Sequence, residues 1–323
     1  MQIIGHKNQL ALLKGFLEKG LFFSSFLFWG PEKTGKKQIA LGFAKGLLCQ
    51  NNVFNGCQDC LACKDNPNRD FLFVSESFLP SSIIKSNDDK PYGIDTSRAV
   101  IKFLSLGASL SKRKVVLIDN AHLLSEEAQN SLLKIIEEPP AKSVIILVSD
   151  KPSLIFETVL SRTLGIYFPL VKQEDILHWV SDHKNLTEKQ ALEISKFSFG
   201  RPGIGFNLMA DGKQLELYRE KVLELLSFER QSAGQKLILL KRFLATDPEI
   251  SKDLEFWQAI LRDELLFSLG LGDLSLILSK KRELNQKDLV LSLKKLSNLS
   301  EMAENFPATA ESALKQMVLS ENL

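Results

Sequence analysis

A strand–helix–strand pattern at residues 111–163 places the strongest constraint on how this chain can fold. Two short apolar runs, at residues 114–118 and 144–148, flank an amphipathic segment. That segment starts after Ser125, a residue type that caps helices, and stops at the proline pair 139–140, which cannot continue a helix. Alternating strands and helices are typical of a parallel sheet. The chain is therefore predicted to contain an α/β domain with a parallel sheet.

Three polar residues lie next to the ends of the predicted strands. Asp119 and Ser149 directly follow the two apolar runs, and Arg162 lies between a short helical stretch and a further predicted strand at residues 165–168. In open parallel sheets, functional groups gather just beyond the strand ends. We therefore treat all three residues as candidates for a functional site.

A glycine-rich loop follows the predicted strand at residues 25–29. A phosphate-binding loop has Gly, four residues, Gly, Lys and then Ser or Thr, between a strand and a helix. Gly30, Gly35 and Lys36 match this pattern, and an amphipathic helix follows them. Lys37 stands where the hydroxyl that binds Mg²⁺ belongs. The pattern by itself is compatible both with a functional phosphate site and with a retained but silent loop.

The acid that ends the strand at residues 114–118 is followed by an amide. In ATP-hydrolysing P-loop proteins, an Asp at this place holds Mg²⁺, and a following Glu polarises the attacking water. Here Asp119 precedes Asn120, whose amide cannot act as a general base. Lys37 and Asn120 therefore both argue against ATP hydrolysis by this chain. Binding of ATP and Mg²⁺ without turnover stays open.

All four cysteines of the chain fall within residues 49–63, with the spacing C-x7-C-x2-C-x2-C. Four thiolates around one centre suit tetrahedral zinc. Four unrelated buried cysteines would not be clustered in this way, and iron–sulfur proteins usually have other spacings. We predict a structural zinc module, with no open coordination position for catalysis, and the ligands are Cys49, Cys57, Cys60 and Cys63.

The remaining periodicity completes the outline. In the first half of the chain, the pattern predicts helices at residues 7–19 and 95–110, a strand at 70–74 and a polar loop at 80–93. Beyond Pro169 the pattern is helical throughout, and the predicted segments are helices at 172–182 and 187–198, a break at 200–203 and five or six helices from about 213 to 320. Thr187 and Gln190 form a possible capping box.

Bulk properties exclude several classes of protein. With 41 basic and 39 acidic residues among 323, no overall charge indicates a nucleic-acid binder, and the basic runs at 112–114 and 280–282 read as solvated faces. No apolar stretch is long enough to cross a membrane, and the N-terminus lacks the features of a secretory signal. The expected protein has two or three domains and a cytoplasmic location.

The whole chain resembles the bacterial clamp-loader family of AAA+ proteins. The matching segments are GPEKTGK at the glycine loop, the four-cysteine module, VVLIDNAHLLSEEAQNSLLKIIEEPP, and the pair Ser161 and Arg162. The resemblance is strong over residues 1–210 and only architectural beyond them. It implies an AAA+ P-loop domain at 1–169 that includes the zinc module, a small helical lid domain at 170–210, and an all-α collar domain for oligomerisation at 211–323.

The resemblance also assigns roles to residues. In the family, a Ser-Arg-Cys motif supplies an arginine finger to the ATP site of the adjacent subunit, which carries over to Ser161 and Arg162, with Thr163 in place of the cysteine. Without the family, Arg162 would read as an ordinary surface arginine. Family ATPases also carry a sensor arginine in the lid, and here Gly203 stands at that position.

These features resemble a largely non-hydrolysing member of the family, an accessory subunit of DNA polymerase III. The implied partners are the gamma/tau and delta clamp-loader subunits, the sliding clamp, and primed DNA within the complex. One rival is an ATP-hydrolysing, gamma/tau-like subunit with degenerate motifs. Another is a zinc-dependent nucleic-acid-binding module, which the near-neutral charge disfavours.

Overall fold

A computed structural model describes residues 3–20, 23–65, 67–76, 91–183, 186–228, 250–271 and 286–305, together with residues 235 and 313. The chain divides into two compact units. The first comprises residues 1–175 and 201–203, and the second comprises residues 176–200 and 204–323. Within the described residues, no helix combines the length and the apolar content needed to cross a membrane.

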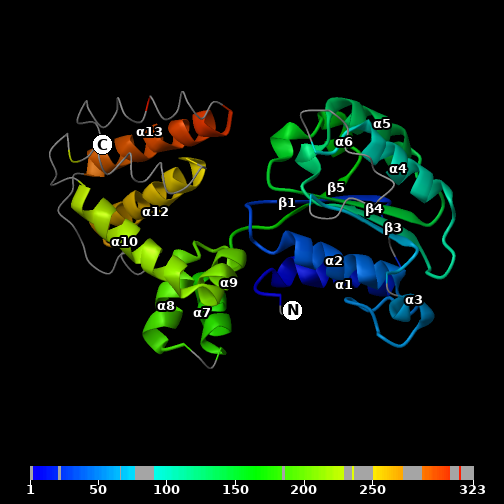
Figure 1. Cartoon of the computed structure of the whole chain (residues 1–323), viewed down its shortest axis with the longest axis horizontal. Coiled ribbons are helices and arrows are strands. Elements are labelled where there is room, and N and C mark those ends of the chain that lie inside the picture. Colours follow the sequence, from blue (N-terminus) through cyan, green and yellow to red (C-terminus); the bar gives the residue numbers. More distant parts are fainter. Residues whose placement is uncertain are drawn as a thin grey trace. The chain divides into compact units, whose positions relative to one another are not determined.

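The first unit is built on a parallel sheet of five strands in the order β2-β3-β4-β1-β5 (Figure 1). The strands are β1 (Ser25–Trp29), β2 (Phe71–Val74), β3 (Lys114–Ile118), β4 (Ser143–Ser149) and β5 (Leu164–Tyr167). Helices cover both faces of the sheet, which accounts for the nearly continuous apolar runs of the central strands. The predicted parallel α/β sheet is confirmed.

The side chains of each strand alternate between two apolar cores. Phe26 and Phe28 of β1 pack against α1 (Lys7–Lys19) and α2 (Lys36–Leu48). Leu27 between them belongs to the opposite core, which is formed with α4 (Ile94–Ser105), α5 (Glu126–Glu137) and the short α6 (Glu157–Leu160). Since strand side chains alternate with a period of two, one apolar run supplies both layers.

The helix boundaries have local causes. Ser125 caps α5, because its hydroxyl accepts a hydrogen bond from the backbone N–H of Ala128 at 3.2 Å. The carboxylates of Glu126 and Glu127 in the first turn complement the positive end of the helix dipole. The prediction for this helix is confirmed.

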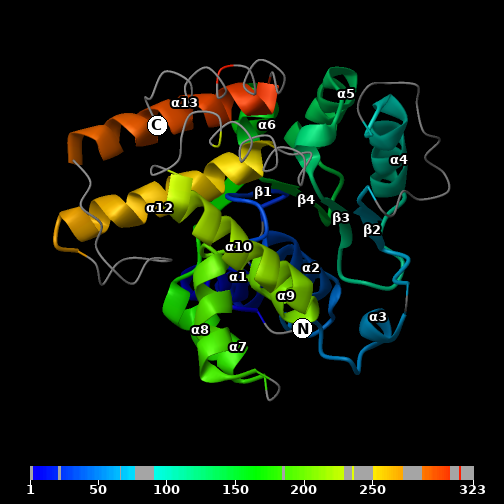
Figure 2. The same cartoon turned by 60° about the vertical axis from the view of Figure 1, so that its left-hand side comes forward.

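The second unit is helical in all its described elements. These are α7 (Gln173–Ser181, which begins in the first unit), α8 (Glu188–Phe197), α9 (Pro202–Ala210, whose first two residues belong to the first unit), α10 (Gly212–Phe228), α12 (Ile250–Ser268) and α13 (Gln286–Asn305). The capping box of Thr187 and Gln190 is present at the start of α8. Helices α12 and α13 lie side by side (Figures 1 and 2).

Some predicted boundaries differ from the structure. The helix expected at 95–110 ends at Ser105, and the break expected at 200–203 is short, because Pro202 already begins α9. Most of the polar loop at 80–93, the basic run at 280–282 and parts of the helical segment at 213–320 lie outside the described residues.

Asp70 fixes the connection that follows α4. Its buried carboxylate accepts hydrogen bonds from three consecutive backbone N–H groups, at 2.7–2.9 Å, and the donors are Ser109, Leu110 and Ser111. These donors lie in the connection between α4 and β3, so the carboxylate holds that connection in a non-helical conformation. The Lys114 ammonium lies 4.0 Å from the same carboxylate.

Replacing Asp70 by Asn is expected to lower the free energy of unfolding at neutral pH by about 1–3 kcal/mol, because a neutral amide satisfies the backbone donors less well. Burial alone would raise the pKa of Asp70, but the backbone N–H groups outweigh burial and hold the pKa below its usual value. The contribution is complete above the unfolded-state pKa of about 3.9 and is lost as the pH falls through the folded-state pKa.

Urea unfolding at about pH 7 and about pH 3 tests this expectation, and the stability gap between wild type and Asp70→Asn should narrow at the lower pH. Asp95→Asn is the matched control, since Asp95 is a partly exposed carboxylate that pairs with Arg98 on its own helix. A gap that is equal at both pH values would contradict the role assigned to the Asp70 charge.

Candidate functional site

The glycine loop leaves the carboxyl end of β1 and leads into α2. Gly30 has φ 142°, and a Cβ at this position would collide with the backbone carbonyl oxygen of Phe168. Gly35 has φ 100° and is the residue that precedes α2. Both positions therefore require glycine, and the loop has the strand–loop–helix context of a phosphate-binding loop.

Lys36 is turned back onto its own loop. Its Nζ donates hydrogen bonds to the carbonyl oxygens of Gly30 at 2.7 Å and Pro31 at 2.6 Å. Burial lowers the pKa of Lys36 to about 8, although the Asp150 carboxylate opposes this shift. The ammonium is therefore held at the mouth of the loop by backbone acceptors.

Lys37 forms an ion pair with the acid at the end of β3. Its Nζ lies 2.9 Å from the Oδ2 of Asp119 and 5.2 Å from the ring centroid of Phe73. The Asp119 side chain is 11% exposed, whereas that of Lys37 is 40% exposed. The structure thus brings the predicted site residues Gly30, Gly35, Lys36 and Asp119 to one edge of the sheet, together with Lys37.

Asn120 is also paired. It has φ 50°, a left-handed conformation that asparagine tolerates better than most residues, and its Nδ2 donates to the Oε2 of Glu76 at 3.1 Å. The hydroxyl of Tyr92 is buried nearby and has no hydrogen-bond partner among the described residues. Burial, together with the charges of Asp119 and Glu76, raises the pKa of Tyr92.

Ser149 belongs to the same edge. The Nδ1 of His122 lies 3.2 Å from the Ser149 hydroxyl and 3.2 Å from the Oδ1 of Asp150. Sequence reasoning missed His122, Asp150 and Glu76 as neighbours of the site. Glu76 and Asp150 each follow a predicted strand by two residues, which is the signal that could have found them.

Arg162 does not join this group. It lies two residues before the start of β5, which runs parallel to β1, so it is at the amino edge of the sheet, opposite to the glycine loop. Of the three candidates next to strand ends, Asp119 and Ser149 therefore lie at the carboxyl edge of the sheet, whereas Arg162 precedes its strand and lies at the amino edge. The Arg162 side chain is 37% exposed and lies 3.4 Å from the Glu137 carboxylate, and Ser161 lies beside it.

Gly203 lies directly against the glycine loop. Its backbone N–H donates to the carbonyl oxygen of Lys33 at 2.9 Å, and both residues belong to the first unit. A Cβ at Gly203 would approach the Lys33 Cβ to 3.0 Å. Contact at position 203 is therefore made by the backbone, without any side-chain charge.

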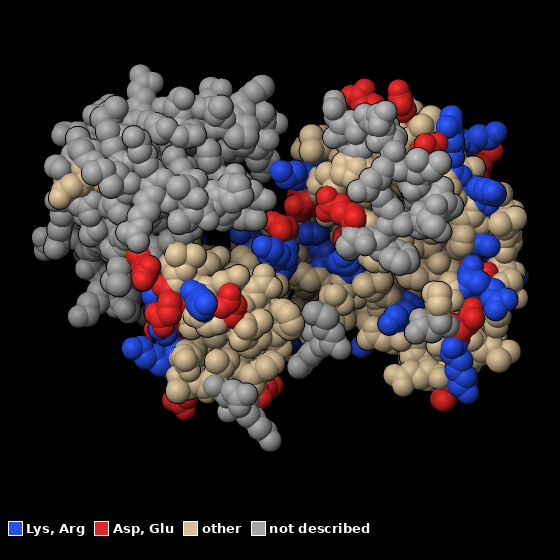
Figure 3. Space-filling model, viewed as in Figure 1, with Lys and Arg blue, Asp and Glu red and all other residues tan. Residues whose placement is uncertain are grey.

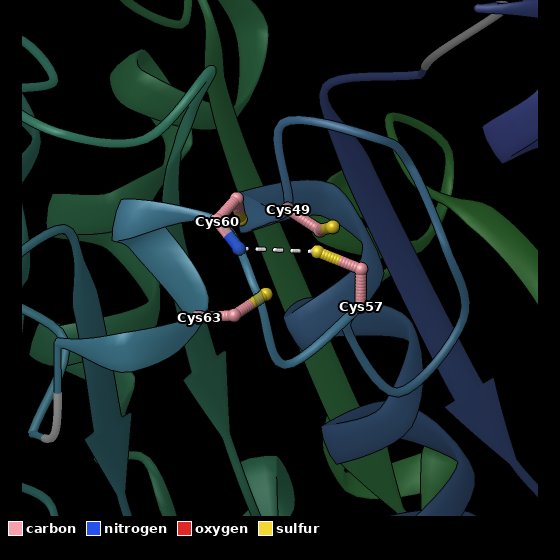
Figure 4. A group of neighbouring side chains, drawn as sticks. All are labelled: Cys49, Cys57, Cys60 and Cys63. Carbon is pink, nitrogen blue, oxygen red and sulfur yellow. Dashed lines mark hydrogen bonds between the residues drawn. The ribbon is translucent and has the colours of Figure 1, made fainter.

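The four cysteines converge between α2 and β2 (Figure 4). Cys49 ends α2, Cys60 precedes the short helix α3 (Leu61–Lys64), and Cys63 lies within it. All four Sγ atoms lie within 4.8 Å of one another. Tetrahedral coordination with metal–sulfur bonds of about 2.3 Å separates the sulfurs by about 3.8 Å, so the cluster can hold a metal ion after small side-chain adjustments.

Backbone N–H groups of the module donate hydrogen bonds to two of the cysteine sulfurs. The N–H of Cys60 donates to the Cys57 Sγ at 3.4 Å, and that of Asn51 donates to the Cys49 Sγ at 3.4 Å. The hydrogen bond from Cys60 is the main cause that lowers the pKa of Cys57 to about 6. Burial raises the pKa of Cys63 to about 12, so four simultaneous thiolates need a compensating cation.

The module is fastened to α2 by close packing. The backbone N–H of Asn55 donates to the carbonyl oxygen of Gly42 at 3.0 Å, and the Phe54 ring packs against the adjoining core. A Cβ at Gly42 would collide with the side chains of Asn55 and Phe54. The cysteine module therefore depends on a glycine in the middle of α2.

The surface of the first unit carries charges of both signs. Figure 3 shows Lys and Arg interspersed with Asp and Glu over the described part of the face in view. This agrees with the near balance of 41 basic and 39 acidic residues in the sequence.

Fold and site together define a parallel α/β protein with a P-loop-like glycine loop and a four-cysteine cluster. The family model described as DNA polymerase III, delta subunit, matches residues 5–172, which is just over half of the chain. The chain belongs to this family.

The chain is also similar to individual curated proteins and to a solved structure. The chain is 31% identical over 181 residues to DNA polymerase III subunit delta' of Pseudomonas aeruginosa, covering 55% of this chain and 53% of that protein. It is 30% identical over 197 residues to subunit tau of Bacillus subtilis, covering 59% and 33%. The chain thus spans about half the length, or less, of these curated relatives. A solved gamma-subunit-related protein of Thermotoga maritima aligns with TM-score 0.43 and 20% identity over 91% of this chain and 99% of that one.

The cysteine cluster predicts that the purified full chain carries about one tightly bound metal ion, measurable by elemental mass spectrometry. Because the chain has only four cysteines, all in the cluster, thiol titration reports on this site alone. Few thiols should react before chelation and all four after it.

Cys57→Ser and Cys63→Ser should each reduce the metal content to near zero and lower the thermal midpoint, because three thiolates and a hydroxyl hold the ion far less tightly. Asp59→Ser, which changes a neighbouring residue outside the cluster, is the matched control. Equal metal content in all three variants would contradict the assignment.

Proposed function

We propose that the chain is a delta-prime-type subunit of a bacterial clamp loader that does not hydrolyse ATP itself and supplies Arg162 to the ATP site of a neighbouring subunit. The observation that carries the proposal is the division of the sheet. The glycine loop is at one edge, with its charges paired internally, and Arg162 is at the opposite edge. A side chain at that edge cannot reach the loop of its own chain.

Two residue positions disfavour ATP turnover by this chain. At position 37, an ammonium replaces the hydroxyl that would bind Mg²⁺, and it is paired with Asp119. At position 120, an amide replaces the general base, and it donates to Glu76. Phosphoryl transfer needs both the metal ion and an oriented water, so either change alone is expected to lower the rate by orders of magnitude.

The Arg162 side chain is partly exposed and is held only by weak contacts, which suits a group offered to a neighbouring subunit. Its guanidinium donates to the Thr158 carbonyl at 3.1 Å and lies 3.4 Å from the carboxylate of Glu137, itself 57% exposed. Exposed ion pairs of this kind contribute little to stability, about 0–1 kcal/mol. The guanidinium can therefore leave Glu137 for another partner at little cost in free energy. A neighbour's triphosphate would compete successfully for a planar, bidentate donor.

The other parts of the chain are assigned structural work. Zinc is the metal that four cysteines in a reducing cytoplasm select best, and in this module it would stabilise the connection between α2 and β2. Residues 170–210 would form the lid domain, and its Glu193 in α8 pairs with Arg219 of α10, which belongs to the following segment. Residues 211–323 would form the helical collar that joins the subunits.

The proposed partners are the gamma/tau and delta subunits, the sliding clamp, and primed DNA held by the complex. Contact with DNA would be shared among subunits and made to backbone phosphates, because charges of both signs cover the described face of the first unit (Figure 3). In this assembly, ATP binding by the neighbours opens the clamp, and Arg162 couples their hydrolysis to release on DNA.

One observation favours the alternative of a hydrolysing, gamma/tau-like subunit. The carboxylate missing at position 120 is present on the adjacent strand end, where the Oε2 of Glu76 lies 3.1 Å from the Asn120 amide. A carboxylate at this place is able to orient a water molecule. The side chain at position 37 argues against it, because no hydroxyl remains for the metal.

Arg162→Ala is expected to lower the ATP turnover of the reconstituted loader by about tenfold or more, because the neighbouring site loses a group that stabilises transition-state charge. Steady-state phosphate release with primed DNA and clamp is the measurement. Arg98→Ala removes another exposed arginine of the same domain and should leave turnover unchanged.

Size-exclusion chromatography must show that the Arg162→Ala loader assembles. An assembled loader with wild-type turnover would overturn the arginine assignment.

The alternative makes its own prediction about the isolated chain. If the alternative holds, the isolated wild-type chain should release phosphate from ATP faster than the Lys36→Ala variant does. If Glu76 replaces the missing base, the Glu76→Gln variant should also be slower than wild type. We expect all three proteins to be indistinguishable from background, because the site lacks an oxygen ligand at position 37. Turnover that disappears in both variants would establish the chain as an ATPase.

A further inference from the structure

The Lys37–Asp119 ion pair lies where a P-loop protein holds its metal ion. In such proteins, Mg²⁺ lies between the residue after the loop lysine and an acid at the end of a neighbouring strand. Here these two positions are joined directly, with the Lys37 Nζ 2.9 Å from the Asp119 Oδ2. Phe73, at the end of β2, places its ring 5.2 Å from the same ammonium.

The residues do not fit Mg²⁺. The ion requires oxygen ligands in near-octahedral geometry at about 2.0–2.1 Å, and an ammonium offers only donors. A divalent ion at Asp119 would also lie within a few ångströms of a fixed positive charge, and no second carboxylate in the described structure contacts Lys37 to offset the repulsion.

The contacts fit a single organic cation. Asp119 is nearly buried, so its charge is only weakly screened by solvent, and an aromatic face attracts an ammonium by its ring quadrupole. Lys37 lies in the first turn of α2, where the helix dipole disfavours a positive charge. The carboxylate and the ring offset that cost, so the ammonium is held at this point by the tertiary structure.

We propose that Lys37 is a tethered cation that replaces the divalent metal and excludes it from this site. This inference rests on the proposed function in one respect, that the glycine loop is a degenerate clamp-loader nucleotide site. It goes further, because it makes a single side chain responsible for metal exclusion. Any phosphate ligand of the loop would then be a metal-free di- or triphosphate, its charge met by Lys36 and Lys37.

The test measures metal binding without reference to catalysis. The full-length chain is titrated with Mn²⁺ in the presence of ADP, and water-proton relaxation enhancement reports the slowly tumbling, protein-bound metal. Wild type should give little or no enhancement over the titrated range. Lys37→Thr, which restores the hydroxyl and removes the ammonium, should give a saturable enhancement with an Mn²⁺–ADP affinity at least about tenfold above the upper limit set by wild type.

Three controls make the result specific. Lys45→Thr changes an exposed lysine of the same helix and should behave as wild type. Lys37→Thr combined with Asp119→Asn should lose the gain, because the acidic ligand is gone. Lys37→Ser repeats the test with a second hydroxyl side chain in case Lys37→Thr fails to fold, as judged by circular dichroism.

Two results would overturn the proposal: equal Mn²⁺–ADP binding by wild type and the hydroxyl variants, or a gain that survives loss of the Asp119 carboxylate. Neither result would contradict the clamp-loader assignment, because that assignment is tested separately by the ATP turnover of the assembled Arg162→Ala loader. Conversely, normal turnover of the Arg162→Ala loader would contradict the arginine assignment alone. A gain in metal binding by Lys37→Thr would still support the tethered cation.

Discussion

Parallel pairing of β1 with β4 and β5 is the constraint on which both halves of the proposed function depend. Because every strand of the sheet runs in the same direction, all carboxyl ends meet at one edge and all amino ends at the other. The residues that follow strands therefore converge around the glycine loop, whereas Arg162, which precedes β5, lies on the far side. One topology thus separates a chain's own nucleotide loop from the arginine that it offers to a neighbour.

Internal charge compensation distinguishes this loop from one prepared for a metal–nucleotide complex. Lys36 donates to carbonyl oxygens of the loop, Lys37 pairs with Asp119, and Asn120 donates to Glu76. Each contact uses a group that a hydrolysing site would direct at phosphate, metal or water. Such a loop still positions the surrounding strands and helices. A subunit that is proposed to support assembly and to activate its neighbour's ATP site needs nothing more from this loop.

Helix α2 connects the two candidate sites of the first unit. It runs from Lys36 to Leu48, between the capping residues Gly35 and Cys49, and its 13 residues span about 20 Å. Gly42 in its middle receives Phe54 and Asn55 of the cysteine module. A metal ion bound by the four thiols would therefore restrain the far end of the same helix whose first turn carries Lys36 and Lys37.

The sequence by itself determined the features that depend on local periodicity and spacing. Apolar runs and capping residues such as Ser125 and Thr187 specify strands and helices, because these signals act within a few residues. The cysteine spacing likewise indicates a common centre before any fold is known.

Strand order and side-chain direction were decided only by the tertiary structure. Glu76 reaches Asn120 because β2 lies beside β3, and Lys37 meets Asp119 because α2 starts above the end of β3. Both contacts join residues more than 40 positions apart, where periodicity carries no information and only the packing of the sheet sets the distance.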